Sequence, residues 1–190
     1  MYKVGALISR NIKIFFRDRS AVFFSFLAVL IVFVLYLLFI GNSITSGLKN
    51  SLAANGFEVQ HNLVKLFSDS WMMAGIMGIG CVTVANGCLA NLVNDTALAK
   101  RRDFYVTPTN SVIVIMSYFF STVIITFAMN AIIFFLVYFY LLTAGMAALS
   151  FGAVMAMLGL ILLTSISSTM LMLSIAVFLK TENAHGAVVA

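Results

Sequence analysis

The residues best suited to binding a partner form one short basic stretch in the middle of the chain. It reads Lys100-Arg101-Arg102-Asp103-Phe104-Tyr105-Val106-Thr107-Pro108. Uncharged stretches long enough to cross a bilayer lie on both sides of it, and a charged loop between two membrane spans is a place where a cytoplasmic partner can bind. Arginine and aromatic side chains are the usual anchors of protein interfaces. The stretch is therefore a candidate docking loop, with the alternative that Lys100, Arg101 and Arg102 only set the membrane topology.

Patterns that would support catalysis are missing from the sequence. There is no Gly-x-x-x-x-Gly-Lys-Ser/Thr motif, so the chain carries no nucleotide-binding P-loop of its own. His61 and His185 are isolated, and no group of residues has the spacing of metal ligands. Cys81 and Cys88 would lie about 10 Å apart in one helix, too far for a disulfide, so we expect two buried thiols. We expect no catalytic residue, no metal site and no cofactor in this chain.

The composition excludes a soluble domain. Hydrophobic residues make up 63% of the chain and charged residues 9%, and the mean hydropathy is +1.11. A soluble domain carries about 25% charged residues, so this chain lacks the charge to cover a surface in water. The net charge of +5 comes from basic residues that cluster beside apolar runs, which is typical of membrane topology signals and does not indicate a nucleic-acid partner.

We expect an all-α integral membrane protein, with an N-terminal amphipathic interfacial helix followed by four transmembrane helices. The predicted regions are a cytoplasmic elbow helix at 1–20 and a transmembrane domain at 21–190, with spans at about 21–40, 71–93, 111–142 and 151–179. The first span is about 30 Å of helix, which matches one hydrocarbon core. Residues 41–69 are predicted to be a polar interval with at most short interfacial helices. Thr143-Ala144-Gly145 predicts the turn between the last two spans.

The distribution of Lys and Arg predicts the orientation. Nine of them lie in the N-terminal segment, the central loop and the C-terminal tail, whereas the other intervals hold only Lys49 and Lys65. By the positive-inside rule, both termini and the central loop are cytoplasmic in a multi-pass protein of the cell (plasma) membrane. The N-terminal segment has apolar residues at helical spacing and its basic residues largely elsewhere, so it is expected to lie along the inner leaflet.

Few polar side chains fall inside the predicted spans. The second span is rich in glycine and alanine, which favours packing against other helices. For Asn86 and Asn130 we expect hydrogen bonds between helices, with contact to a substrate as the alternative. For the hydroxyl-rich run Thr164–Thr169 we expect bonds to the backbone of its own helix, with a local break in the helix as the alternative. No charged residue is predicted at mid-membrane depth, which argues against an ion-coupled transporter.

Three motifs resemble membrane subunits of ABC-2 type transporters. The first is Arg10-Asn11 followed by Phe15-Phe16-Arg17-Asp18-Arg19 at the entry to a Phe-rich span. The second is Asp95, then Asp103-Phe104-Tyr105-Val106-Thr107-Pro108, then Ser117-Tyr118 and Ser121. The third is Thr181-Glu182-Asn183-Ala184 after the last predicted span. The motifs are individually loose, and their order and spacing carry the resemblance over the whole chain.

The resemblance implies a permease subunit of an ATP-driven exporter. Its partners would be a second permease subunit, identical or different, and a separate ABC ATPase that binds ATP and Mg²⁺. The implied ATPase-docking residues are Asp95, Lys100, Arg101, Arg102, Asp103, Phe104, Tyr105 and Pro108, with elbow-helix residues Arg10, Lys13, Arg17 and Arg19. Candidates for the export path are Asn86, Asn130, Thr164 and Ser168. The family has six spans and only four are predicted here, so an alternative is a truncated, non-transporting membrane protein with a regulatory or immunity role.

Overall fold

The computed structural model describes residues 2–97, 111–143, 145 and 149–178, and these are helical apart from short connections. The helices are α1 (Tyr2–Arg17), α2 (Arg19–Leu35), the π-helical segment η1 (Tyr36–Ile40), α3 (Gly41–Ala54), α4 (His61–Ala97), α6 (Ser111–Thr143) and α7 (Phe151–Phe178). No strand occurs in this part of the chain. The predicted all-α class is confirmed.

Four helical stretches are long and apolar enough to cross a membrane, as predicted. They are Arg19–Ala54, His61–Val93, Val112–Thr143 and Phe151–Ala176. The first two extend well beyond the predicted spans at 21–40 and 71–93. Most of the interval predicted to be polar, 41–69, is therefore part of the long helices, and only residues 55–60 connect them.

The polar residues of α3 do not end the helix because their side chains bond to its own backbone. The hydroxyls of Ser43, Thr45 and Ser51 each donate to the carbonyl four residues earlier, at 3.3, 2.8 and 2.9 Å. Such local bonds satisfy a hydroxyl without interrupting the helix. The chain turns only at Gly56, whose φ of +82° is a left-handed conformation that favours glycine.

Asp18 separates α1 from α2. Its backbone is extended, with φ −82° and ψ 90°, and its carboxylate accepts a hydrogen bond from the Ala21 amide at 3.1 Å. An aspartate at this position caps a helix N-terminus. The predicted elbow segment at 1–20 thus contains one helix that ends at Arg17 and the start of the next. Its location along the inner leaflet stays a prediction.

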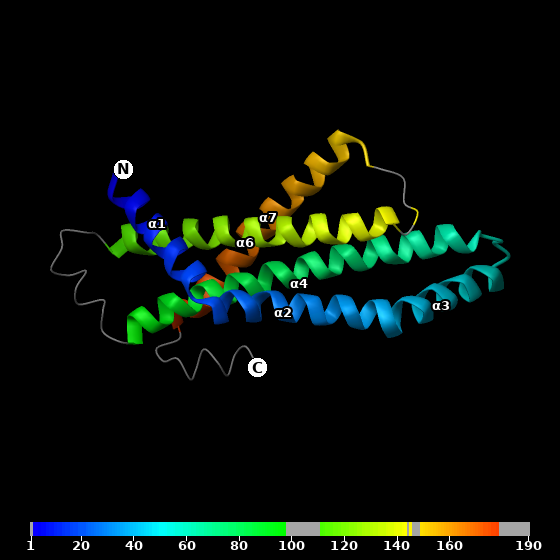
Figure 1. The fold of residues 1–190 in the computed structure, drawn as a ribbon, viewed down its shortest axis with the longest axis horizontal. Helices are drawn as coiled ribbons and strands as arrows, with labels where there is room; N and C mark the ends of the chain where they lie inside the picture. The colour runs from blue at the N-terminus through cyan, green and yellow to red at the C-terminus, as the bar shows by residue number, and fades with distance from the viewer. Residues whose placement is uncertain (1, 98–110, 144, 146–148, 179–190) are drawn as a thin grey trace.

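Helix α4 lies at the centre of the bundle. It contacts α2, α3, α6 and α7, and α2, α4 and α6 run side by side while α7 crosses them obliquely (Figure 1). In the most apolar stretches of α4 and α6, about half of the residues are buried (50% and 56%). The corresponding share is 17% for the first span and 22% for the last. The prediction that the second span faces other helices is therefore confirmed, and the third span shares this position.

Two glycines allow this close packing of α4. A Cβ added at Gly80 would lie 3.5 Å from Val29 on α2 and would collide with Asn130 on α6, and one added at Gly87 would lie 2.8 Å from the Ser25 hydroxyl. Gly75 and Gly78, by contrast, have open space where a Cβ would be. Within the described residues, close packing of α4 therefore requires glycine at positions 80 and 87 but not at 75 and 78.

The turn between the last two spans lies where it was predicted. Helix α6 ends at Thr143, Gly145 has a φ of +97°, and α7 begins at Phe151. Helix α7 then continues without a break through the hydroxyl-rich run. The Thr164 and Ser165 hydroxyls donate to the Ile161 carbonyl at 3.0 and 2.7 Å, so the alternative of a local break is wrong.

Candidate functional site

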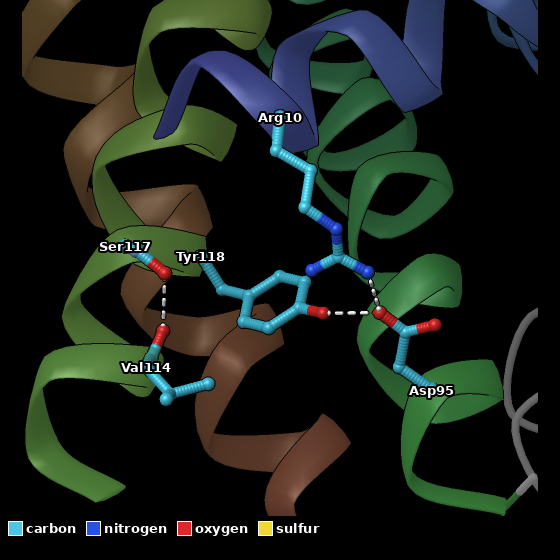
Figure 2. A network of polar contacts seen from close by, with 5 residues as sticks. All are labelled: Arg10, Asp95, Val114, Ser117 and Tyr118. Carbon is cyan, nitrogen blue, oxygen red and sulfur yellow. Dashed lines mark hydrogen bonds and ion pairs between the residues drawn. The ribbon is translucent and has the colours of Figure 1, made fainter. Parts of the chain in front are cut away.

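Residues from three helices meet around the carboxylate of Asp95. The side chain of Arg10 on α1 and the hydroxyl of Tyr118 on α6 both donate to Asp95 Oδ2 on α4, at 3.2 and 2.6 Å. Figure 2 shows the guanidinium and the phenol approaching this oxygen from two sides. We name the group of Arg10, Asp95 and Tyr118 the three-helix clasp.

The two bonds of the clasp differ in strength. The Tyr118 bond is short and its acceptor is charged, and hydrogen bonds to charged groups contribute about 1.5–3 kcal/mol. The Arg10 side chain is 38% exposed and that of Asp95 16%, so water screens the ion pair, and exposed pairs contribute about 0.2–1 kcal/mol. The tyrosine hydroxyl is therefore the stronger tie, and the arginine mainly supplies the opposite charge.

The position of the clasp in the chain connects it to the candidate docking loop. Asp95 lies in the last turn of α4, which ends directly before residues 98–110, and Tyr118 lies about two turns into α6, which begins directly after them. A single 2.6 Å hydrogen bond thus joins the helix that leads into this segment to the helix that follows it. The bond from Arg10 adds α1 to the same point.

Two other residues of the family-like motif support the start of α6 locally. The Ser117 hydroxyl donates to the Val114 carbonyl at 2.6 Å (Figure 2), and the Ser121 hydroxyl donates to the Tyr118 carbonyl at 3.0 Å. Both serines are buried. Both hydroxyls bond within their own helix, so the two serines fill a tightly packed face of α6.

A small cavity adjoins the clasp on its inner side. Its volume is about 10 Å³, which is close to the space that one water molecule needs. Its lining residues are Asn11, Ile14, Phe15, Cys88, Asn91, Asp95, Tyr118, Ser121, Thr122 and Ile125. The amide of Asn11 is buried, and its two polar atoms have no hydrogen-bond partner within the described residues. Polar groups thus surround the junction of α1, α4 and α6.

The remaining predicted docking residues are only partly placed. Lys13 and Arg17 are exposed on α1, and Arg19 is exposed at the first position of α2. The stretch Lys100–Pro108, which holds the other docking residues, lies outside the described residues. The structure therefore places Arg10 and Asp95 in one site and leaves the rest of the predicted loop as a prediction.

The four residues predicted along an export path do not form one group. Asn86 is half-buried on α4, Ser168 is buried on α7, and Thr164 is exposed with its hydroxyl bonded to its own helix. Asn130 is fully buried, and its amide donates to the Thr126 carbonyl of its own helix at 2.9 Å. The expected hydrogen bond from Asn130 to another helix is therefore not formed, because Gly80 of α4, which has no side-chain donor, faces its oxygen.

A second polar contact, at the other end of α4, was missed by the sequence analysis. The Tyr36 hydroxyl donates to Asp69 Oδ1 at 2.6 Å and lies 3.3 Å from the Ser68 hydroxyl, and all three residues are buried. The two aspartates of α4, Asp69 and Asp95, are about 39 Å apart along the helix, more than the roughly 30 Å of a hydrocarbon core. An acidic residue directly before an apolar span was the available signal.

The two cysteines lie on α4, within the described residues. Cys81 and Cys88 are both free and buried, as predicted. The described residues contain no group of three His, Cys, Asp or Glu side chains that could hold a metal ion.

No family model matches the chain, and neither a curated protein nor a solved structure is significantly similar to it. The family resemblance of its motifs is therefore an inference from the residues and their arrangement alone.

Proposed function

We propose that this chain is the membrane-spanning permease subunit of an ATP-driven ABC-2 type exporter. In this function a separate ABC ATPase binds the loop between α4 and α6 on the cytoplasmic side, and a second permease subunit completes the transport unit. ATP and Mg²⁺ bind to the ATPase, and this chain supplies the membrane path.

The observation that carries the proposal is the three-helix clasp. Two of the three family-like motifs contribute to it: Arg10 comes from the first, and Asp95 and Tyr118 come from the second. Arg10 and Tyr118 donate to the same Asp95 oxygen. Residues 85 positions apart in the chain come together there. Motifs that serve one function are expected to converge in this way, whereas chance matches are not.

The clasp also supplies a physical route for coupling. A partner that pulls or pushes the docking loop acts on both ends of that loop at once, because the Tyr118 bond joins them. Arg10 transmits the same displacement to α1, which connects through Asp18 to the first span. Movement of the ATPase would thus reach α2, α4 and α6 together.

The first test is co-purification. The chain is expressed with the ABC ATPase encoded beside it and purified in mild detergent, and we expect a stable complex. The double variant Arg101→Glu/Arg102→Glu is expected to weaken the complex about tenfold or more, because arginine anchors dominate interfaces. The matched control is Lys49→Glu/Lys65→Glu, which reverses two exposed charges at the other end of the bundle and should leave the complex intact.

Each outcome distinguishes the candidate functions. Full binding by the arginine variant refutes docking through the loop. A stably inserted chain that forms no complex with the ATPase refutes the permease function and favours the regulatory or immunity protein. Ion flux from the purified chain alone would instead indicate an independent channel.

A further inference from the structure

Helix α1 has one face that is fixed against the bundle. Phe15 is fully buried and Asn11 nearly so, and Phe15 packs with Val84 and Cys88 of α4 and with Ile125 of α6. The clasp adds a polar tie from Arg10 to Asp95 on the same side of the bundle. Apolar packing and the ion pair together prevent α1 from rotating about its axis.

The opposite face of α1 carries two exposed cations. Each residue of an α-helix is rotated by about 100° from the previous one, so Lys13 and Arg17 lie about 200° beyond Asn11 and Phe15. Both cations are exposed. Because the buried face is packed against the bundle, both cations leave α1 on the side that faces away from it.

These cations line an open groove of about 700 Å³. The lining residues are Ala6, Ser9, Arg10, Lys13, Ile14, Arg17 and Asp18. Arg10, Lys13 and Arg17 outnumber Asp18, the one carboxylate among these lining residues, so the groove presents an excess of positive charge. Its volume falls in the range of about 300–1,000 Å³ that is typical of ligand sites, and it is much larger than a phosphate ion needs.

The groove lies beside the start of the first candidate membrane span, Arg19–Ala54. Helix α1 crosses the end of the bundle at which the first span begins, beside the last turn of α4 and the start of α6 (Figure 1). Large apolar side chains are exposed next to the cations in sequence: Phe16 on α1 (48% exposed) and Phe23 and Phe24 early in α2 (61% and 64%). Cations followed by exposed aromatic rings are typical of segments at the membrane surface.

We propose that this groove binds the headgroup of an anionic phospholipid, with Lys13 and Arg17 contacting its phosphate and the neighbouring apolar side chains contacting its acyl chains. The positive charge of the groove complements the lipid phosphate, and the exposed rings account for a lipid better than for free phosphate. Lys13 and Arg17 also belong to the elbow-helix residues that the family resemblance implies, but lipid binding needs no ATPase, so the test below separates the lipid site from the proposed transport function.

The test measures lipid binding to the full chain in neutral detergent. Native mass spectrometry gives the Kd of the first bound phosphatidylglycerol, with phosphatidylcholine as the zwitterionic reference. Basic residues near an anionic membrane surface contribute about 1 kcal/mol each, so Lys13→Gln/Arg17→Gln is expected to raise the phosphatidylglycerol Kd about 25-fold. The charge-conserving variant Lys13→Arg/Arg17→Lys is expected to keep most of the affinity.

The matched control is Lys49→Gln/Lys65→Gln, which removes two exposed charges from the other end of the bundle and should leave the Kd unchanged.

Equal losses of lipid affinity in both glutamine variants, or equal affinity for the two lipids, would overturn the proposal. Inorganic phosphate is expected not to compete at millimolar concentration; if it binds as tightly as the lipid, the groove is a phosphate site. If the variant Lys13→Gln/Arg17→Gln still binds the lipid but no longer co-purifies with the ATPase, the proposal is wrong and the groove binds an acidic protein surface.

Discussion

Replacement of Gly80 by alanine tests the central packing of the bundle. Gly80 lies on α4 against Asn130 of α6 and Val29 of α2. An added Cβ would lie 3.5 Å from Asn130 Cγ and from Val29 Cγ2, and it would collide with Asn130 Oδ1. Either the amide group must move or the helices must separate.

The size of the effect follows from what the amide would lose. Asn130 is fully buried and its Nδ2 donates to the Thr126 carbonyl at 2.9 Å, so displacement costs a hydrogen bond worth about 1 kcal/mol. Overpacking adds about 1–3 kcal/mol. The better helix propensity of alanine offsets about 1 kcal/mol. We expect Gly80→Ala to lower the free energy of unfolding by about 1–3 kcal/mol.

The assay is reversible unfolding in mixed micelles, followed by far-ultraviolet circular dichroism. The matched control is Gly78→Ala on the same helix, where a Cβ meets no atom within 4 Å; it is expected to be neutral or slightly stabilising. A double-mutant cycle with Asn130→Ala removes the colliding atom. In that background Gly80→Ala should cost at least about 1 kcal/mol less, since residues in contact are coupled by this order of magnitude.

Two results would refute this reasoning. Equal stability of Gly80→Ala and Gly78→Ala would mean that α4 and α6 do not approach as closely as described. An unchanged cost of Gly80→Ala in the Asn130→Ala background would mean that the destabilisation comes from another contact.

The same unfolding assay tests the polar contacts at the two ends of α4. Tyr118→Phe removes the short bond to the clasp carboxylate and is expected to lower the free energy of unfolding by about 1.5–3 kcal/mol. Arg10→Gln removes a partly exposed ion pair and should lower it by about 1 kcal/mol or less. A larger loss for the arginine variant would contradict the assignment of the tyrosine as the stronger tie. At the other end, Tyr36→Phe removes the 2.6 Å bond to buried Asp69 and is expected to cost about 1.5–3 kcal/mol. Ser68→Ala removes only a 3.3 Å contact and should cost less than Tyr36→Phe, and a larger loss for the serine variant would show that the tyrosine is not the main donor.

Helix boundaries show where reasoning from the sequence was limited by local chemistry. Residues 41–54 are rich in Asn, Ser, Thr and Gly and were predicted to lie in a polar interval with at most short interfacial helices, yet they continue the first span as α3. Composition alone does not reveal that hydroxyls such as that of Thr45 can bond to the preceding helical turn. The turn at Thr143–Gly145 was predictable because a run without charge is too long for one crossing and small residues interrupt it.

The sequence by itself determined the all-helical class, the four apolar spans and the two buried thiols. These follow from composition, from the length of helix that a bilayer requires and from the geometry of a single helix, none of which depends on how the helices are arranged. It also identified Arg10, Asp95 and Tyr118 as separate members of motifs.

Only the tertiary structure decided which of these residues meet. The clasp joins positions 10, 95 and 118, and the bond between Tyr36 and Asp69 joins α4 to the π-helical segment. Helices in a bundle pack through faces set by the shapes of many side chains at once, so neighbours in space are not encoded by the spacing of any one motif. The same packing buried one face of α1 and left Lys13 and Arg17 exposed on the other. The charge pattern predicted a helix at the membrane surface, and the fold showed which cations line the groove.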